Sequence, residues 1–73
     1  MKVGQIIPGA YQRLDIVYRD GTFYGGLHCG NTLDVLIQDV WRPTRIEYSQ
    51  SAESWYLVGF GQDAEIIGLT VRN

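Results

Sequence analysis

One pair of neighbouring residues, His28 and Cys29, could in principle carry out nucleophilic chemistry. A cysteine thiolate is a nucleophile, and a histidine can act as its base. Successive side chains on an extended chain point to opposite faces, however, so these two cannot easily contact each other. The chain contains one histidine, so no other residue of that type can replace it. We therefore favour a buried, non-reactive Cys29, since free cysteines usually pack as small apolar side chains.

Other patterns that could support catalysis are weak. Asp34, Glu47 and Asp63 could be paired as acid and base only under an assumed fold, and acidic residues on strands usually lie on solvated faces. The run Gly59-Phe60-Gly61 precedes no expected helix, so it lacks the setting of a phosphate-binding loop. A structural zinc site needs about four Cys or His ligands, and the chain has one of each. We expect no enzyme activity, metal or cofactor.

The strongest candidate for ligand binding is a group of aromatic and arginine residues in the second half of the chain. Arginine presents a planar set of donors that suits phosphate or carboxylate, and aromatic rings can stack on bases. The alternative is that the two tryptophans are core residues, which we favour for Trp55 and leave open for Trp41. The candidate ligand-binding residues are Trp41, Arg42, Arg45, Tyr48, Trp55 and Tyr56.

Alternation along the strand expected at residues 40–48 indicates where Trp41 points. It places Trp41 and Arg45 on one face and Ile46 and Tyr48 on the other. Because Ile46 and Tyr48 are typical core residues, Trp41 and Arg45 are expected to face outward, unless Pro43 marks a bulge that exchanges the faces.

The same strand is a candidate protein-binding surface. Pro43 cannot donate to a β-ladder, so it predicts an edge strand or a bulge. An outward Trp41 between charged neighbours on such an edge resembles an interaction hot spot. Arg45 and Glu47 could equally form a surface ion pair of little energetic weight.

These residues must be positioned by strands, because the chain shows no apolar spacing typical of a helix. Short β-rich runs separated by Gly, Asn, Asp and Ser predict an all-β fold, a small barrel or sandwich. A loop is expected at residues 25–32, and Gln62-Asp63 is expected to form a turn. The first segment, residues 3–7, could add a strand to its own barrel or to a neighbour's. Strands are expected at residues 14–19, 22–24, 33–37, 40–48, 55–60 and 65–72.

The first hairpin is the clearest local signal. Asp20-Gly21 between β-formers favours a two-residue type I′ turn, because glycine accepts positive φ without strain. That register sets Tyr18 opposite Phe23. Alternation puts Leu14, Ile16 and Tyr18 on one face.

Length and composition limit the remaining possibilities. The chain has 73 residues and one cysteine, so it forms one domain without an internal disulfide. A domain of this size buries only about 60% of its unfolded surface, and partner subunits often support such domains. We therefore expect a homo-oligomer. A net charge of −2 counts against a nucleic-acid coating protein, which usually has a basic stripe.

The N-terminus reads as neither a signal peptide nor a membrane anchor. Its apolar run is short and interrupted, and the chain has no apolar span of about 20 residues. A soluble, cytoplasmic protein is expected, in which a lone thiol stays reduced.

From Leu27 onward the chain resembles a family of very small uncharacterised proteins from Gram-positive bacteria, their phages and mobile elements. The resemblance covers roughly two-thirds of the chain, and its most specific part is the stretch from Trp41 to Glu47. It implies an SH3-like barrel of five to six antiparallel strands and a setting in which small proteins disarm host defence. The matching segments are Leu27-His28-Cys29-Gly30, residues 33–37, residues 41–47, Trp55-Tyr56-Leu57-Val58-Gly59 and residues 68–72.

Two hypotheses follow, with a third behind them. The first is a counter-defence protein that sequesters a nucleotide-derived signalling molecule in a pocket formed by a homo-oligomer. The second is a protein-protein interaction module that inhibits a host protein through the Trp41 edge strand. The third hypothesis is nucleic-acid binding through one face of the barrel, and the net negative charge of the chain counts against it.

Overall fold

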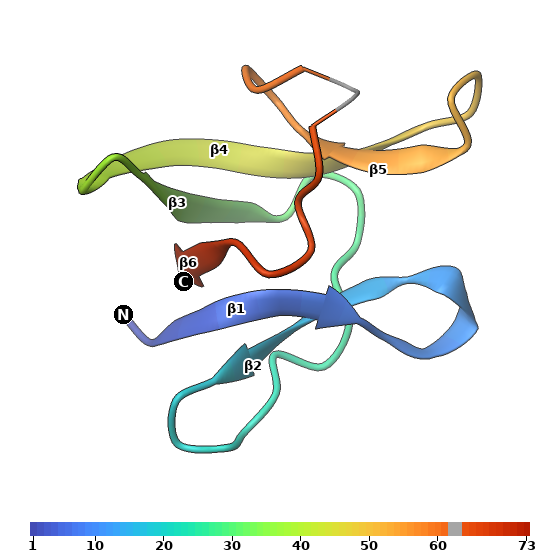
Figure 1. The fold of residues 1–73 in the computed structure, drawn as a ribbon. Helices are drawn as coiled ribbons and strands as arrows, with labels where there is room; N and C mark the ends of the chain where they lie inside the picture. Colours follow the sequence, from blue (N-terminus) through green and yellow to red (C-terminus); the bar gives the residue numbers. More distant parts are fainter. Residues whose placement is uncertain (62–63) are drawn as a thin grey trace.

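Six strands form one antiparallel sheet in a computed structural model, which describes residues 1–61 and 64–73 (Figure 1). The order across the sheet is β2-β1-β6-β3-β4-β5. Within the described residues the one helical element is a three-residue 3-10 turn, η1 (Ala10–Gln12), so the expected all-β class is confirmed. The strands are β1 (Val3–Pro8), β2 (Leu14–Tyr18), β3 (Thr32–Ile37), β4 (Val40–Ser49), β5 (Ser54–Leu57) and β6 (Thr70–Arg72).

The N-terminal segment adds a strand to the sheet of its own chain, one of the two places expected for it. β1 lies between β2 and β6 and pairs with both in antiparallel register. The two ends of the chain therefore lie side by side in the middle of the sheet (Figure 1), where Lys2 and Asn73 exchange two backbone hydrogen bonds of 3.0 Å. These contacts bring the first and last strands of the chain together.

The sheet curls so that β1 and β2 face β3, β4 and β5 across the core (Figure 1). Alternate residues of β2 are buried, as expected, with Ile16 at 0% exposure. Two loops also contribute to the core, through Leu27 and Ile66. The buried apolar residues are Ile6, Leu14, Ile16, Tyr18, Leu27, Leu33, Val35, Ile46, Leu57, Ile66 and Val71.

The close approach of β1 and β2 depends on Gly4. A Cβ atom at this position would overlap the carbonyl oxygen of Val17 and lie 2.9 Å from Cγ2 of Ile16. Real Cβ atoms do not approach heavy atoms so closely, so a side chain here would force the two strands apart. Glycine in a buried strand position thus marks a close backbone approach.

The predicted type I′ turn at Asp20-Gly21 is wrong. Val17 rather than Tyr18 lies opposite Phe23, and φ is positive at Gly21 (86°) but not at Asp20. The loop has three residues, a turn that ends on a left-handed glycine. Asp20 Oδ1 accepts hydrogen bonds from the N–H (3.0 Å) and hydroxyl (2.6 Å) of Thr22, which stabilises this longer loop.

The type I′ geometry occurs instead between β3 and β4. Gln38 and Asp39 have φ of 50° and 65°, and Ile37 lies directly opposite Val40. Two left-handed residues that join paired strands define a type I′ turn. The twist of the flanking strands favours this turn although neither residue is glycine.

The strand expected at residues 22–24 does not form, and only an isolated bridge at Phe23 remains there. Two other expected strands are shorter than the sequence indicates. The strand expected at residues 55–60 ends at Leu57, because the Phe60 N–H turns back to the Leu57 carbonyl (3.1 Å) and Gly59 adopts φ of 93°. The strand expected at residues 65–72 begins only at Thr70. The turn expected at Gln62-Asp63 lies outside the described residues.

Candidate functional site

Trp55 lies on β5 opposite Tyr48 of β4, near one end of the sheet. The two ring centroids are 5.1 Å apart with an interplanar angle of 69°, an edge-to-face contact. Trp55 is half-buried against the core. Tyr48 is 40% exposed, so its expected place in the core is wrong. Tyr48 shares the inward face of β4 with Ile46, but it lies near the end of the strand, beyond the part that packs against the apolar core.

The indole of Trp55 also supports the turn between β1 and β2. Its Nε1–H donates a hydrogen bond of 3.0 Å to the Gln12 carbonyl. Tyr11 and Gln12 are both left-handed, with φ of 57° and 62°. Such a conformation costs roughly 1–2 kcal/mol for a residue other than glycine. Hydrogen bonds from Gly9 N–H to the Arg13 carbonyl (2.8 Å) and from Arg13 N–H to the Ala10 carbonyl (3.1 Å) close the turn around them.

This turn forms one wall of a cleft that we call the aromatic cleft. The Tyr11 side chain is 94% exposed, which is unusual for a large aromatic residue. Strained backbone that presents an exposed side chain is typical of binding sites. The cleft has a volume of about 320 Å³ and is lined by Tyr11, Gln12, Arg13, Cys29, Tyr48 and Trp55.

Cys29 is exposed and lines the aromatic cleft. Its expected burial as a small apolar side chain is therefore wrong. The cysteine lies in the loop between β2 and β3, where the Asn31 side chain accepts a hydrogen bond of 2.7 Å from the His28 N–H. That loop turns Cys29 toward the surface.

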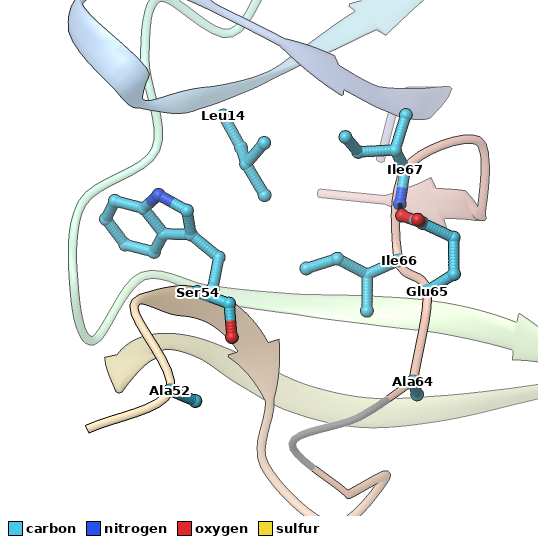
Figure 2. A pocket seen from close by; sticks show the side chains of 8 residues that line it. Leu14, Ala52, Ser54, Ala64, Glu65, Ile66 and Ile67 are labelled. Atoms are coloured by element: carbon cyan, nitrogen blue, oxygen red, sulfur yellow. Dashed lines mark hydrogen bonds between the residues drawn. The ribbon is translucent and has the colours of Figure 1, made fainter. Parts of the chain in front are cut away.

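A second cleft, the seam cleft, lies on another side of Trp55, where β2 and the edge strand β5 face each other without pairing. Figure 2 shows Leu14 and Ile66 pointing toward one another across it. Its volume is about 480 Å³. The lining residues are Leu14, Ala52, Ser54, Trp55, Ala64, Glu65, Ile66 and Ile67.

Trp41 lies on the outer face of the sheet, as expected. The pairing of β3 with β4 is continuous from Thr32 to Ile37, so Pro43 makes no bulge. The Arg72 guanidinium stacks on the Trp41 ring, with its Cζ 4.5 Å from the ring centroid. Arg72 Nε also contacts Asp34 Oδ2 at 2.9 Å. The ring of Trp41 is therefore partly covered by the protein itself.

The first half of β4 forms an edge of the sheet, as the sequence predicts. β5 pairs with β4 only from Ile46 onward, so the first half of β4 pairs only with β3. Ile46 N–H donates to the Asn31 carbonyl of the adjoining loop, and alternation along β4 then points the nitrogen of Pro43 away from β3. The proline removes no ladder hydrogen bond at this position.

The six candidate residues do not form one cluster. Trp41 and Arg45 share the outer face, where Arg45 Nε pairs with Glu47 Oε2 at 2.9 Å. Tyr56 lies opposite Glu47 on this face. Arg42 is exposed on the other face of β4, opposite Val35. Tyr48 and Trp55 remain, and they form part of the aromatic cleft.

Of the three acidic residues considered for catalysis, two form ion pairs and the third lies outside the described residues. Asp34 pairs with Arg72 and Glu47 pairs with Arg45. Asp63 lies outside the described residues. In the part of the chain that the structure describes, no group of three or more His, Cys, Asp or Glu side chains could hold a metal ion. No helix there has the length and apolar character needed to cross a membrane.

Three residues of the aromatic cleft, Tyr11, Gln12 and Arg13, were not identified from the sequence. The available signal was an aromatic residue two positions after Pro8-Gly9, where the chain cannot continue a strand easily. The second cleft wall comes from Tyr48 and Trp55, more than thirty residues later. Only the folded sheet brings the two walls together.

Comparison with known proteins places the chain in a family without an assigned activity. A crystal structure of a protein from Ruminococcus gnavus, a structural-genomics target, is similar over 99% of this chain and 100% of that one, with 41% identity and a TM-score of 0.83. None of the curated proteins compared with the chain matches it. The family model for a domain of unknown function, DUF5348, matches residues 6–73, and the chain belongs to this family.

Proposed function

We propose that this protein is a non-catalytic binding protein that sequesters a nucleotide-derived molecule in the aromatic cleft. The observation that carries the proposal is the presence of three aromatic rings and one arginine around a single cleft of about 320 Å³. A flat ring and an anionic group are the two chemical features that this set of residues recognises best.

The aromatic residues suit a base. Tyr48 and Trp55 are held at a fixed edge-to-face angle of 69°, and Tyr11 is held on the strained turn across the cleft. Stacking of a base on an aromatic side chain contributes about 1–3 kcal/mol. Since the Tyr48 and Trp55 rings contact each other before the ligand arrives, these two side chains lose little conformational entropy on binding.

Arg13 suits a phosphate. Its side chain is exposed, it lines the cleft directly after the strained turn, and its backbone is held by two hydrogen bonds. An arginine donates two parallel hydrogen bonds to phosphate oxygens. Arg13 therefore takes the role that the sequence assigned to Arg42 and Arg45, neither of which lines this cleft.

The setting implied by the family resemblance extends the proposal. A small cytoplasmic protein with an SH3-like barrel, encoded by a phage or mobile element, can counter host defence by removing a signalling nucleotide. We propose that a second copy covers the open side of the cleft, where Tyr11 is 94% exposed. A homo-oligomer of this kind would bury the ligand more completely than one chain does.

The test is thermal unfolding of the pure protein with cyclic di- and trinucleotides, cyclic ADP-ribose isomers and plain nucleotides. A ligand at about 1,000 times its Kd adds roughly 4 kcal/mol, and each kcal/mol raises Tm by about 4–8 °C in a small domain. Tyr11→Asn and Arg13→Gln should each remove most of the shift. Asparagine tolerates the left-handed backbone, so the first variant removes the ring without added strain.

Arg45→Gln is the matched control, because Arg45 lies on the outer face and outside both clefts. It should leave the ligand-induced shift unchanged. A panel in which no compound raises Tm, or a shift that Arg45→Gln abolishes as fully as Arg13→Gln does, contradicts the proposal.

A second candidate is a protein-protein interaction module that uses the first half of β4, which pairs on one side only. This edge could accept a strand from a host protein. Two observations weaken the candidate: Pro43 offers no N–H to an added strand, and Arg72 already stacks on Trp41. A stable complex recovered from host lysate and lost in Trp41→Ala, but not in Tyr11→Asn, would favour it.

A further inference from the structure

The turn between β1 and β2 has no anchor in the apolar core, since none of the residues Ala10–Gln12 is buried. Two backbone hydrogen bonds close the turn, from the Gly9 N–H to the Arg13 carbonyl and from the Arg13 N–H to the Ala10 carbonyl. Both bonds join residues of the turn and its two flanking positions. They therefore shape the turn but do not fix its position relative to the rest of the sheet.

The backbone of this turn is strained at two successive residues. Tyr11 has φ of 57° and ψ of 39°, and Gln12 has φ of 62°. The left-handed region is unfavourable for a residue with a Cβ atom, and proteins usually contain such residues singly. A strained conformation of this kind persists only where the surrounding structure holds it. We therefore looked for a contact from outside the turn that opposes its relaxation to negative φ.

Trp55 supplies that contact. Its Nε1–H donates a hydrogen bond of 3.0 Å to the carbonyl of Gln12, 43 residues away along the chain. In the part of the chain that the structure describes, it is the one hydrogen bond that reaches Ala10–Gln12 from another element. No strand ladder supports the turn from that side, because β2 and β5 do not pair.

The donor of this hydrogen bond is itself held in place. The Trp55 ring packs against the apolar core and contacts the Tyr48 ring edge to face, with 5.1 Å between the centroids. The turn lies on the same side of the molecule as β5 (Figure 1). A donor on a fixed ring determines where its acceptor must lie, so the indole defines the position of the Gln12 carbonyl. Tyr11 and Arg13, on either side of Gln12, then line the aromatic cleft.

We propose that Trp55 is a positioning residue of the aromatic cleft, and that its indole N–H is a latch on the strained turn. While the latch is closed, Tyr11 and Arg13 line the cleft. When the hydrogen bond is removed, the turn relaxes to negative φ and both side chains leave the cleft. For ligand binding this inference rests on the proposed function, whereas the latch is a property of the free protein and is tested there.

The test is NMR spectroscopy of the free, isotope-labelled protein and its Trp55→Phe variant, which keeps an aromatic ring and loses the donor. The one-bond coupling between Cα and Hα distinguishes positive from negative φ. We expect positive φ at Tyr11 and Gln12 in the native protein and negative φ in the variant. Trp41→Phe is the control, since Trp41 contacts Arg72 on the outer face and does not line the cleft. It should leave both couplings unchanged.

The native protein gives a second measurement that needs no substitution. The chain has two tryptophans, so it has two indole N–H signals. We expect the Trp55 indole proton to exchange with solvent about fivefold more slowly than that of Trp41, because it is hydrogen-bonded.

A glycine substitution separates the latch from a general loss of packing. Glycine adopts the left-handed region without strain and keeps the carbonyl that accepts the hydrogen bond. In a Gln12→Gly background, Trp55→Phe should therefore lower Tm by about half as much as in the native background, and residue 12 should keep positive φ. Gln38→Gly is the matched control, because Gln38 is also left-handed but lies in the β3–β4 turn. It should not change the effect of Trp55→Phe.

Three results would overturn the proposal: unchanged couplings at Tyr11 and Gln12 in Trp55→Phe, an equal loss of Tm in the native and Gln12→Gly backgrounds, or equal exchange rates of the two indole protons. These results concern the free protein. A latch that passes all three tests, in a protein whose Tm no nucleotide raises, would support the positioning role and contradict the proposed function alone.

Discussion

Trp55 connects three features of the structure at the scale of a single residue. Its indole N–H holds the Gln12 carbonyl at 3.0 Å, its ring contacts Tyr48, and its side chain separates the aromatic cleft from the seam cleft. The sequence indicates a large, half-buried residue here, because tryptophan combines an apolar body with one donor. It gives no sign of the two clefts, because their other walls come from distant parts of the chain.

Asp20 shows how one exposed side chain fixes a local register. Hydrogen bonds from the Thr22 hydroxyl and N–H, with a further contribution from Lys2 at 3.3 Å, lower the Asp20 pKa from 3.8 to about 2. A carboxyl group with a lowered pKa in the folded state stabilises the protein above its unfolded pKa. That stability is lost as the pH falls through the folded pKa.

We therefore expect the free energy of unfolding to fall between about pH 4 and pH 2, and Asp20→Asn to remove part of this fall. Urea unfolding at a series of pH values measures it, and an NMR titration of the Asp20 carboxyl should give a midpoint of about 2. A wild-type protein and an Asp20→Asn variant with parallel pH profiles would show that the Thr22 hydrogen bonds do not contribute.

At the scale of elements, alternation was a reliable guide and turn chemistry was not. The period of two placed Leu14, Ile16 and Tyr18 in the core and Trp41 on the outer face. The Asp20-Gly21 segment forms a three-residue loop instead of the expected type I′ turn, and the type I′ turn occurs at Gln38-Asp39, where the sequence indicates a turn but not its type. Burial fixes which face of a strand points inward, whereas a turn follows the twist and register of strands that a local sequence does not specify.

The Gln38-Asp39 turn gives a direct test of this explanation. Both residues have positive φ, so replacing them with Asn-Gly should relieve strain and stabilise the protein by about 1 kcal/mol. We expect the midpoint of thermal unfolding to rise by about 4–8 °C.

Gln50→Gly in the β4–β5 turn is the control, since φ at Gln50 is not positive. It should not stabilise the protein, because glycine there only increases the freedom of the unfolded chain. Equal stabilisation by both changes would mean that backbone strain at Gln38-Asp39 is not the cause.

At the scale of the whole molecule, the fold class follows from the sequence and the site does not. Short β-rich runs and frequent turn residues predict an all-β fold, expected with five to six strands. Six form, although the segment at residues 22–24 is not one of them and β1 is. The pairing of β1 with β6 joins the two ends of the chain, and no local pattern encodes that contact. Both clefts depend on this topology, since it places β2 and the β1–β2 turn opposite β5.

The predicted ligand-binding set shows the same limit. It included Tyr48 and Trp55, because large aromatic residues are visible in any sequence, and the structure places both at the aromatic cleft. It also included Trp41 and Arg45, which are near Tyr48 in sequence but lie on the opposite face of β4. Proximity along a strand does not make residues neighbours, because each step of one residue reverses the face.

Alkylation of Cys29 tests the central claim most directly. Cys29 is the one cysteine of the chain and lines the aromatic cleft, so its reaction rate with iodoacetamide reports on occupancy of that cleft alone. We expect a nucleotide that raises Tm to slow this reaction at least tenfold when it saturates the protein, and Arg13→Gln to restore the original rate. An unchanged rate with a nucleotide that raises Tm would place the ligand elsewhere and contradict the proposed site.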